Sequence, residues 1–192
     1  MRRLVLGSTS VYRRELLSRL RLPFAVEAPH VDESPQVGEA PAALARRLAA
    51  AKAAAVAHKH PDAIVIGSDQ VADLAGEPLG KPGNHDNAVA QLRRMRGRTV
   101  IFHTALTVTC VETGFAQHDL APVRVRFREL EEAEIEAYLR AEQPYDCAGS
   151  AKSEGAGIAL LDAIDSDDPT ALIGLPLIRT CRMLRAAGLR VF

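Results

Sequence analysis

The 192-residue chain lacks an excess of either charge, because 24 lysine and arginine residues are matched by 24 aspartate and glutamate residues. Proteins that bind long nucleic acids without sequence preference need a basic excess, since neutralising backbone phosphates supplies their affinity. The balance therefore argues against stable nucleic-acid binding. It favours a small ligand that is held in a local basic pocket.

The sequence also has few cysteines and no long apolar run. Cys110, Cys147 and Cys181 are far apart, odd in number and without a CxxC pair, which favours ordinary thiols in a reducing compartment. No apolar run approaches the roughly 20 residues of a membrane span, and the N-terminus has no signal-peptide core. We expect a cytoplasmic protein that does not contact a membrane.

Several standard catalytic motifs are missing: there is no GxxxxGK[ST] loop, no GxGxxG after a strand, no HExxH and no GxSxG. His58 and His60 are close together, but the end of a helix explains them at least as well as a metal does. The aspartates at 165, 167 and 168 lack the spacing of an EF-hand. We interpret them as turn and cap residues.

Apolar periodicity predicts alternating strands and helices. The expected strands cover residues 4–6, 23–28, 63–67, 98–111, 115–128 and 158–161. The expected helices begin after Ser10, at Pro41, at the cap Asn84, at Glu131 and at Asp168, the last one interrupted around 174–176. With no repeat or linker, we expect a single domain over residues 1–192, of the α/β class with a mixed α+β character.

The first candidate site follows the N-terminal strand, which ends in Gly7-Ser8-Thr9-Ser10. A helix begins directly after it, with Arg13 and Arg14 in its first turn. Free backbone N–H groups, hydroxyls and guanidiniums together suit a phosphate. A simple N-cap with two solvated arginines explains the same residues, although cations at a helix N-terminus oppose its dipole.

The second candidate is Asp69, at the end of the apolar strand 63–67. A carboxylate at the edge of a sheet can bind a divalent ion or accept a proton from water, and a strand-end turn explains it equally well. Asp32 and Glu33 are further carboxylates in a loop. Lysines at 52, 81 and 152 suit phosphate, but each taken singly fits a solvated surface charge better.

Taken together, six segments resemble the Maf family of nucleoside triphosphate pyrophosphatases. They are LVLGSTSVYRRELL near the start, VDE at 31–33, IGSDQV at 66–71, GKP at 80–82, AGSAKSEG at 148–155 and GLPL at 174–177. They span nearly the whole chain in the family's order. The resemblance implies a Maf/inosine-triphosphatase-like fold, with an elongated mixed sheet flanked by helices around a nucleotide cleft, often assembled as a homodimer.

The resemblance also implies a reaction, which is hydrolysis between the α- and β-phosphates of a nucleoside triphosphate. The implied catalytic residues are Glu33, Lys52, Asp69 and Lys81, and those near the phosphates are Ser8, Arg13, Arg14 and Lys152. A divalent cation, Mg²⁺ or Mn²⁺, would be held by Glu33 and Asp69, and Asp69 would take the proton of the attacking water. Such a polyanion resists attack until cations screen it.

Gln70 after the aspartate and Glu154 in AGSAKSEG resemble the branch of the family that acts on 7-methyl-GTP. N7-methylation makes guanine cationic, which favours an aromatic face and a nearby carboxylate. Glu154 would accept from the donors of guanine, with Tyr12 and Gln70 completing the pocket. Close members of the branch carry tryptophan in place of Tyr12, so we expect a softer preference; alternatively, Tyr12 belongs to the core stripe of Leu16 and Leu20.

Other functions stay open at this point. One is a pyrophosphatase of the same family that acts on dTTP or UTP. Another is a nucleotide- or RNA-binding regulator of cell division with incidental hydrolysis, which the set of Glu33, Lys52, Asp69 and Lys81 speaks against. A third is an inosine-triphosphate-type hydrolase, which Gln70 and Glu154 disfavour. Removing modified nucleotides from the pool and arresting division are both plausible cellular roles by resemblance.

Overall fold

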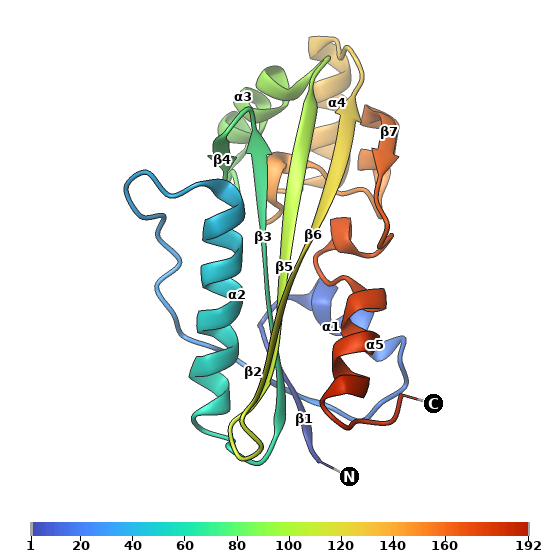
Figure 1. Ribbon diagram of the computed structural model, residues 1–192. Helices are drawn as coiled ribbons and strands as arrows, with labels where there is room; N and C mark the ends of the chain where they lie inside the picture. The colour runs from blue at the N-terminus through green and yellow to red at the C-terminus, as the bar shows by residue number, and fades with distance from the viewer. Residues whose placement is uncertain (1, 192) are drawn as a thin grey trace.

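The structure is a computed structural model, and it describes residues 2–191. Strands and helices alternate along this range, which confirms the predicted α/β class (Figure 1). In chain order the strands are β1 (Leu4–Gly7), β2 (Ala25–Glu27), β3 (Ile64–Leu74), β4 (Glu77–Leu79), β5 (Thr99–Cys110), β6 (Phe115–Phe127) and β7 (Leu161–Asp165). The α-helices are α1 (Val11–Ser18), α2 (Pro41–Ala57), α3 (His85–Met95), α4 (Glu132–Glu142) and α5 (Leu177–Ala186).

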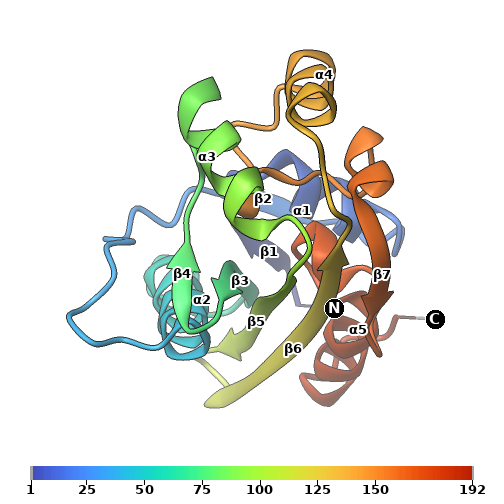
Figure 2. The same ribbon diagram turned by 90° about the horizontal axis from the view of Figure 1, so that it is seen from above.

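The strands form one mixed sheet in the order β2-β1-β3-β5-β6-β7, with β4 paired to β3. β1 is parallel to both β2 and β3, and the other pairs are antiparallel. The long strands β3, β5 and β6 run along the length of the molecule (Figure 1). Helix α2 covers one face of the curved sheet, and α1 and α5 lie on the other (Figure 2).

The pairing along β3 contains a gap that later positions the candidate site. β1 pairs with β3 only as far as Ile66, and β4 joins the same strand at Ala72. Within residues 2–191, β5 is therefore the only strand that pairs with residues 67–71 of β3. The other edge of β3 is therefore unpaired over these residues, which leaves room for a cleft beside the strand.

Two hydrophobic clusters fill the ends of the elongated fold. The upper one packs α3 and α4 against the sheet through residues such as Leu92, Phe102 and Leu139. The lower one packs α1 and α5 through residues such as Leu17 and Leu106. Since side chains alternate along a strand, Phe102, Thr104 and Leu106 share one face of β5. Buried Thr104 therefore marks a polar band between the two apolar clusters.

One predicted boundary is wrong, and it concerns Asp69. The strand expected over 63–67 extends to Leu74, so Asp69 lies inside β3 and not at its end. The cause is the ladder with β5, which continues from Val65 opposite Thr109 to Asp73 opposite Ile101. A local pattern of apolar residues does not report such long-range pairing.

Two further corrections fall in the C-terminal third. Residues Ala156–Leu160 form a 3₁₀ helix, and strand β7 begins only after it, at Leu161. The predicted helix at Asp168 is a 3₁₀ turn over Ala171–Ile173, and α5 starts at Leu177, after the expected interruption. Asp168 is therefore not an N-cap, because that position before α5 is Pro176. Its Oδ2 nevertheless accepts from the backbone N–H of Arg179 in the first turn of α5 at 3.0 Å.

No helix within residues 2–191 is both long enough and apolar enough to cross a bilayer.

Gly67 sets how closely α2 approaches β3. A Cβ atom built at this position would lie 2.3 Å from the carbonyl oxygen of Ala49 and 2.6 Å from the backbone nitrogen of Ala53. Both obstacles are helix backbone, which cannot rotate away. The close packing therefore requires glycine, and it places the helix turn that carries Lys52 directly beside β3.

We predict that Gly67→Ala lowers the free energy of unfolding by at least about 2 kcal/mol, because the new methyl group forces the helix off the sheet. Chemical denaturation measures the loss. Gly80→Ala serves as the matched control: nothing lies within 4 Å of its added Cβ, and its expected effect is within about 0.5 kcal/mol. Equal stability of the two variants would contradict the close packing.

Candidate active site

A cavity of about 1190 Å³ lies at the gap beside β3 and is lined by residues from the N-terminal and C-terminal parts of the chain. Ten of the eleven site residues predicted from the sequence line it. They are Ser8, Tyr12, Arg13, Glu33, Lys52, Asp69, Gln70, Lys81, Lys152 and Glu154. Arg14 is exposed on α1 and does not line the cavity. The structure thus gathers residues that are up to 146 positions apart, from Ser8 to Glu154.

The α2 side of the cavity holds a buried lysine between two carboxylates. Lys52 Nζ lies 2.6 Å from Asp69 Oδ1 and 2.9 Å from Glu33 Oε1. Lys52 is 5% exposed and Asp69 is 6% exposed, whereas the Glu33 side chain reaches into solvent. A charge this deeply buried needs an opposite partner. The two carboxylates therefore converge on one point at the wall of the cavity.

Arg13 provides a second, differently bound cation. Its Nε donates to the carbonyl of Gly174 at 2.9 Å, and one terminal nitrogen donates to Ser8 Oγ at 3.5 Å. Burial lowers the pKa of the Arg13 guanidinium, and the charges of Asp69 and Glu33 act in the opposite direction. Two of its five N–H groups are used, so three remain for an anionic ligand.

The hydroxyls before α1 bind the backbone at the start of the helix. Ser10 Oγ accepts from the backbone N–H of Arg13 at 3.4 Å, which confirms Ser10 as the N-cap. Ser8 Oγ accepts from the backbone N–H of Ser10 at 3.1 Å. The cavity wall at this point therefore combines a capped helix start with the half-buried side chain of Arg13.

Ser68 and Gln70 reach the opposite side of the sheet from Asp69, because neighbouring side chains on a strand alternate. Both contact the segment 171–174. Ser68 Oγ, which has one hydrogen to donate, lies 3.0 Å from Gly174 O and 2.8 Å from Ala105 O of β5, and Gln70 Nε2 donates to Ala171 O and Leu172 O at 3.0 and 2.9 Å. A role for these carbonyls was not predicted from the sequence. The GLPL motif at 174–177 was the only sequence motif near them.

At another part of the cavity, Tyr12 presents its ring to a cation. The ammonium of Lys152 lies 5.8 Å from the ring centroid and is paired with Glu142 at 2.8 Å. The Tyr12 hydroxyl donates to Asp146 Oδ2 at 3.4 Å. Burial raises the pKa of Tyr12 above its usual range. Tyr12 thus lies in the cleft and outside the hydrophobic cluster that includes Leu16.

The turn that carries Glu154 is held against α4, and this support was also missed from the sequence. Tyr138 Oη accepts from the backbone N–H of Lys152 at 3.0 Å, and Glu142 Oε2 accepts from that of Ala156 at 2.8 Å. A Cβ atom on Gly157 would lie 2.6 Å from the Lys152 carbonyl. Gly157, two residues after the AGSAKSEG motif, therefore permits the tight turn that brings Glu154 to the cavity.

Lys81 is exposed at the rim of the cavity. The segment beside it is fixed, because Pro82 O accepts from Asn87 Nδ2 at 2.9 Å and Gly83 N–H donates to Tyr145 O at 3.0 Å. Lys81 is thus an exposed cation on an anchored loop, suited to meeting an anion at the mouth of the cavity.

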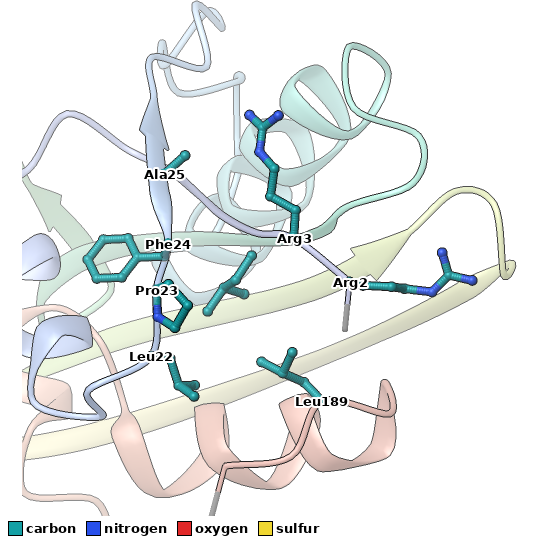
Figure 3. Close-up of a pocket in the computed structure, with 8 residues that line it drawn as sticks. Arg2, Arg3, Leu22, Pro23, Phe24, Ala25 and Leu189 are labelled. Atoms are coloured by element: carbon teal, nitrogen blue, oxygen red, sulfur yellow. The ribbon is translucent and has the colours of Figure 1, made fainter.

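A second cavity, of about 340 Å³, has a different character. Leu22, Pro23, Phe24 and Leu189 surround it, and the guanidinium of Arg2 points away from it (Figure 3). Arg2 is paired with Glu112 instead. Apart from Arg2 and Arg3 its lining residues are apolar, and no carboxylate is among them. We therefore place the candidate active site in the larger cavity.

Cys147 lies beside this site but is not a nucleophile. Its thiol is 3.8 Å from the Tyr12 hydroxyl. Burial, followed by the charge of Asp146, raises the pKa of Cys147 to about 12. The thiolate is the reactive form of cysteine. At neutral pH the residue therefore stays a neutral thiol within the wall of the cleft.

Comparisons with known proteins cover nearly the whole chain. The family described as "Maf-like protein" matches residues 3–187. The 7-methyl-GTP pyrophosphatase of Albidiferax ferrireducens is 71% identical over 190 residues, which are 99% of this chain and 96% of that protein. The proteins of the same name from Polaromonas sp. and Burkholderia pseudomallei are 70% and 61% identical, over 100% and 99% of this chain and 87% and 90% of theirs.

We predict that Cys147 in the folded protein reacts with iodoacetamide at pH 8 about 10² to 10³ times more slowly than in guanidinium-unfolded protein. The reason is the small thiolate fraction at a pKa of about 12, and the rate should rise as the pH approaches that value. Mass spectrometry of the labelled peptide measures it. The unfolded chain is the control, and equal rates in both states would show an activated thiol.

Proposed function

The chain belongs to the Maf family, and we propose that it hydrolyses 7-methyl-GTP to 7-methyl-GMP and pyrophosphate. The observation that carries the proposal is one cavity in which a buried lysine, a half-buried arginine and converging carboxylates meet an aromatic face already in contact with a cation. Relatives at up to 71% identity over nearly the full length bear the name of this activity. The proposed reaction is the hydrolysis of an acid anhydride bond.

The phosphate end of the substrate would lie against Arg13, Lys52, Lys81 and Ser8. Three cations from separate elements can bind a triphosphate from several sides, and buried cations act more strongly than exposed ones. They would hold the charge that develops as the bond between the α- and β-phosphates breaks. Arg14 does not line the cavity, and the observed partners of Lys152 are Tyr12 and Glu142. Their phosphate roles rest on the family resemblance alone.

Asp69 is suited to take the proton of the attacking water. Asp69 lines the cavity, and its Oδ1 accepts from Lys52, while Oδ2 has no hydrogen-bond partner within residues 2–191. A carboxylate accepts a proton in its ionised form, and the ammonium of Lys52 lies 2.6 Å from this one. Lys52 therefore orients Asp69 as well as facing the phosphates.

Glu33 and Asp69 fit a Mg²⁺ or Mn²⁺ ion because both approach the same ammonium within 3 Å. In residues 2–191 no group of three or more histidine, cysteine, aspartate or glutamate side chains converges as a metal site. Two carboxylates nevertheless suffice for Mg²⁺, which is commonly bound by one or two carboxylates together with substrate phosphates. The ion would neutralise the triphosphate when bound.

The base end would lie against Tyr12 and Glu154. The Tyr12 ring already has an ammonium 5.8 Å from its centroid, so its face is accessible to a cation. A 7-methylguanine ring carries such a positive charge, and Glu154 adds an acceptor and a negative charge in the same cavity.

We further propose that the protein acts as a homodimer in the cytoplasm. The three free cysteines fit a reducing compartment.

We predict that Asp69→Asn lowers kcat by a factor of about 10² to 10⁴, because the amide cannot take the proton from water. Pyrophosphate release at saturating substrate and Mg²⁺ measures it. Asp73→Asn, four residues along the same strand and outside the cavity, is the control and should keep near wild-type turnover. Near wild-type turnover of the Asp69 variant would remove Asp69 from this role.

We also predict that kcat/KM decreases in the order 7-methyl-GTP, GTP, then dTTP and UTP. Cation–π contact of the methylated base with Tyr12 supports a preference over GTP of about 3- to 30-fold. Tyr12→Trp should widen that preference, since indole binds cations better than phenol does. Steady-state kinetics on the four nucleotides measures both effects. Equal rates on all four would disprove the proposed substrate.

A further inference from the structure

Glu33 lies on the long loop between β2 and α2, which projects beside α2 in Figure 1. Among residues 2–191, only two side chains of α2, Arg47 and Lys52, form hydrogen bonds or ion pairs with residues 32–39 of this loop. Lys52 contacts Glu33 at the cavity, whereas Arg47 does not line the cavity. The loop is therefore attached to the helix at the site and again at a point away from it.

Arg47 binds two parts of the loop at once. Its Nε donates to Glu39 Oε1 at 2.6 Å, and one terminal nitrogen donates to Glu39 Oε2 at 2.8 Å and to the Ser34 carbonyl at 3.0 Å. A planar guanidinium matches a carboxylate through two parallel hydrogen bonds. The Glu39 side chain is only 9% exposed, so solvent screens this pair less than it screens an ordinary surface pair.

The loop between these attachments is itself folded by its own backbone. Glu39 Oε2 also accepts from the backbone N–H of Gln36 at 3.0 Å, and the Glu39 N–H donates to the Gln36 carbonyl at 3.0 Å. Asp32 Oδ1 accepts from the backbone N–H of Ser34 at 2.9 Å. The two residues that flank Glu33 are thus joined to each other, and the second of them is bound to α2.

The contact of Glu33 with Lys52 is too weak to order the loop alone. The Glu33 side chain is 57% exposed, and an ion pair with an exposed partner contributes little net stability. Ordering a loop costs conformational entropy at every residue. A second attachment has to offset this cost, and Arg47 supplies it from a position five residues before Lys52 on the same helix.

We infer that Arg47 is a positioning residue of the proposed active site, which keeps the Glu33 carboxylate at the ammonium of Lys52 by holding the loop on α2. What Glu33 does there rests on the proposed function. Because Arg47 does not line the cavity, it acts through the loop and does not touch the substrate. Without Arg47 the buried pair of Lys52 and Asp69 remains, but Glu33 is free to move away from it.

The pair of Arg47 and Glu39 persists under ordinary assay conditions. The hydrogen bonds from Arg47, followed by the one from the Gln36 backbone, lower the pKa of Glu39 to about 2. A carboxylate with a lowered pKa stabilises the fold fully above its ordinary pKa, and this effect is lost as the pH falls towards about 2. A change of activity near neutral pH therefore does not originate in this pair.

Hydrogen–deuterium exchange tests the positioning without any substrate. In Arg47→Ala we expect the backbone N–H of Gln36 to exchange at least about tenfold faster, the effect of losing about one hydrogen bond. Backbone N–H groups in β3 should exchange at unchanged rates, which shows that the variant is folded. Unchanged exchange at Gln36 would overturn the inference.

Arg46→Ala is the matched control. Arg46 precedes Arg47 on α2, is exposed and forms no ion pair in the described range 2–191. Its removal takes the same charge from the same helix turn but leaves the loop attached. We expect wild-type exchange of the loop and wild-type kinetics. If Arg46→Ala has the same effects as Arg47→Ala, the effects come from net charge and the inference is wrong.

A double-mutant cycle with Glu33→Gln separates positioning from a direct effect of charge. Arg47→Ala alone should lower kcat/KM for 7-methyl-GTP about 10- to 100-fold and raise the Mg²⁺ concentration needed for half the maximal rate. In the Glu33→Gln background it should change kcat/KM less than about threefold, because the loop then has no carboxylate to position. Equal factors in both backgrounds would overturn the inference.

Arg47→Lys is the conservative variant. Lysine keeps the charge but lacks the planar fork, so it cannot hold Glu39 and the Ser34 carbonyl together. Its loop exchange and its kcat/KM should lie between those of the wild type and Arg47→Ala, and full wild-type values would contradict the proposed geometry. Failure of the proposed function has a different signature: no pyrophosphate is released from 7-methyl-GTP, while exchange of the loop still depends on Arg47.

Discussion

The contact between Lys52 and Asp69 is the interaction on which the arrangement of the cleft depends. Two opposite charges are buried at 2.6 Å, and either one alone would be costly to keep away from water. The pair forms because Gly67 lets the backbone of α2 pack directly against β3. The same approach brings Glu33, on the loop before α2, to the lysine. A packing contact in the sheet thus creates the charge arrangement of the site.

The cleft also depends on where the sheet is left open. β1 separates from β3 after Ile66, and β4 does not join until Ala72. Residues on both faces of β3 therefore reach one cavity: Asp69 from the α2 face and Gln70 from the other. Neighbouring residues of one short segment of β3 therefore have different surroundings and different roles. The carboxylate lies with the cations of the α2 side, while the amide contacts the C-terminal segment.

The apolar clusters at the two ends of the fold hold this polar band rigid. Phe102 belongs to one cluster and Leu106 to the other, with Thr104 between them on the same face of β5. Polar groups buried between two packed cores must find partners. Here they find the carbonyls of segment 171–174. The stability of the cores and the orientation of the site residues are consequently linked through the same strands.

The sequence by itself determined the family resemblance, the alternation of strands and helices, the cap at Ser10 and ten residues that line the cavity. Those features depend on short segments whose residue types carry local information. The tertiary structure alone decided that Asp69 lies within a strand, that Arg14 lies outside the cavity and that Lys152 contacts Tyr12. It also decided the direction of the Gln70 amide. That direction is set by carbonyls about 100 residues away in the chain, and backbone oxygens at such a distance leave no local pattern in the sequence.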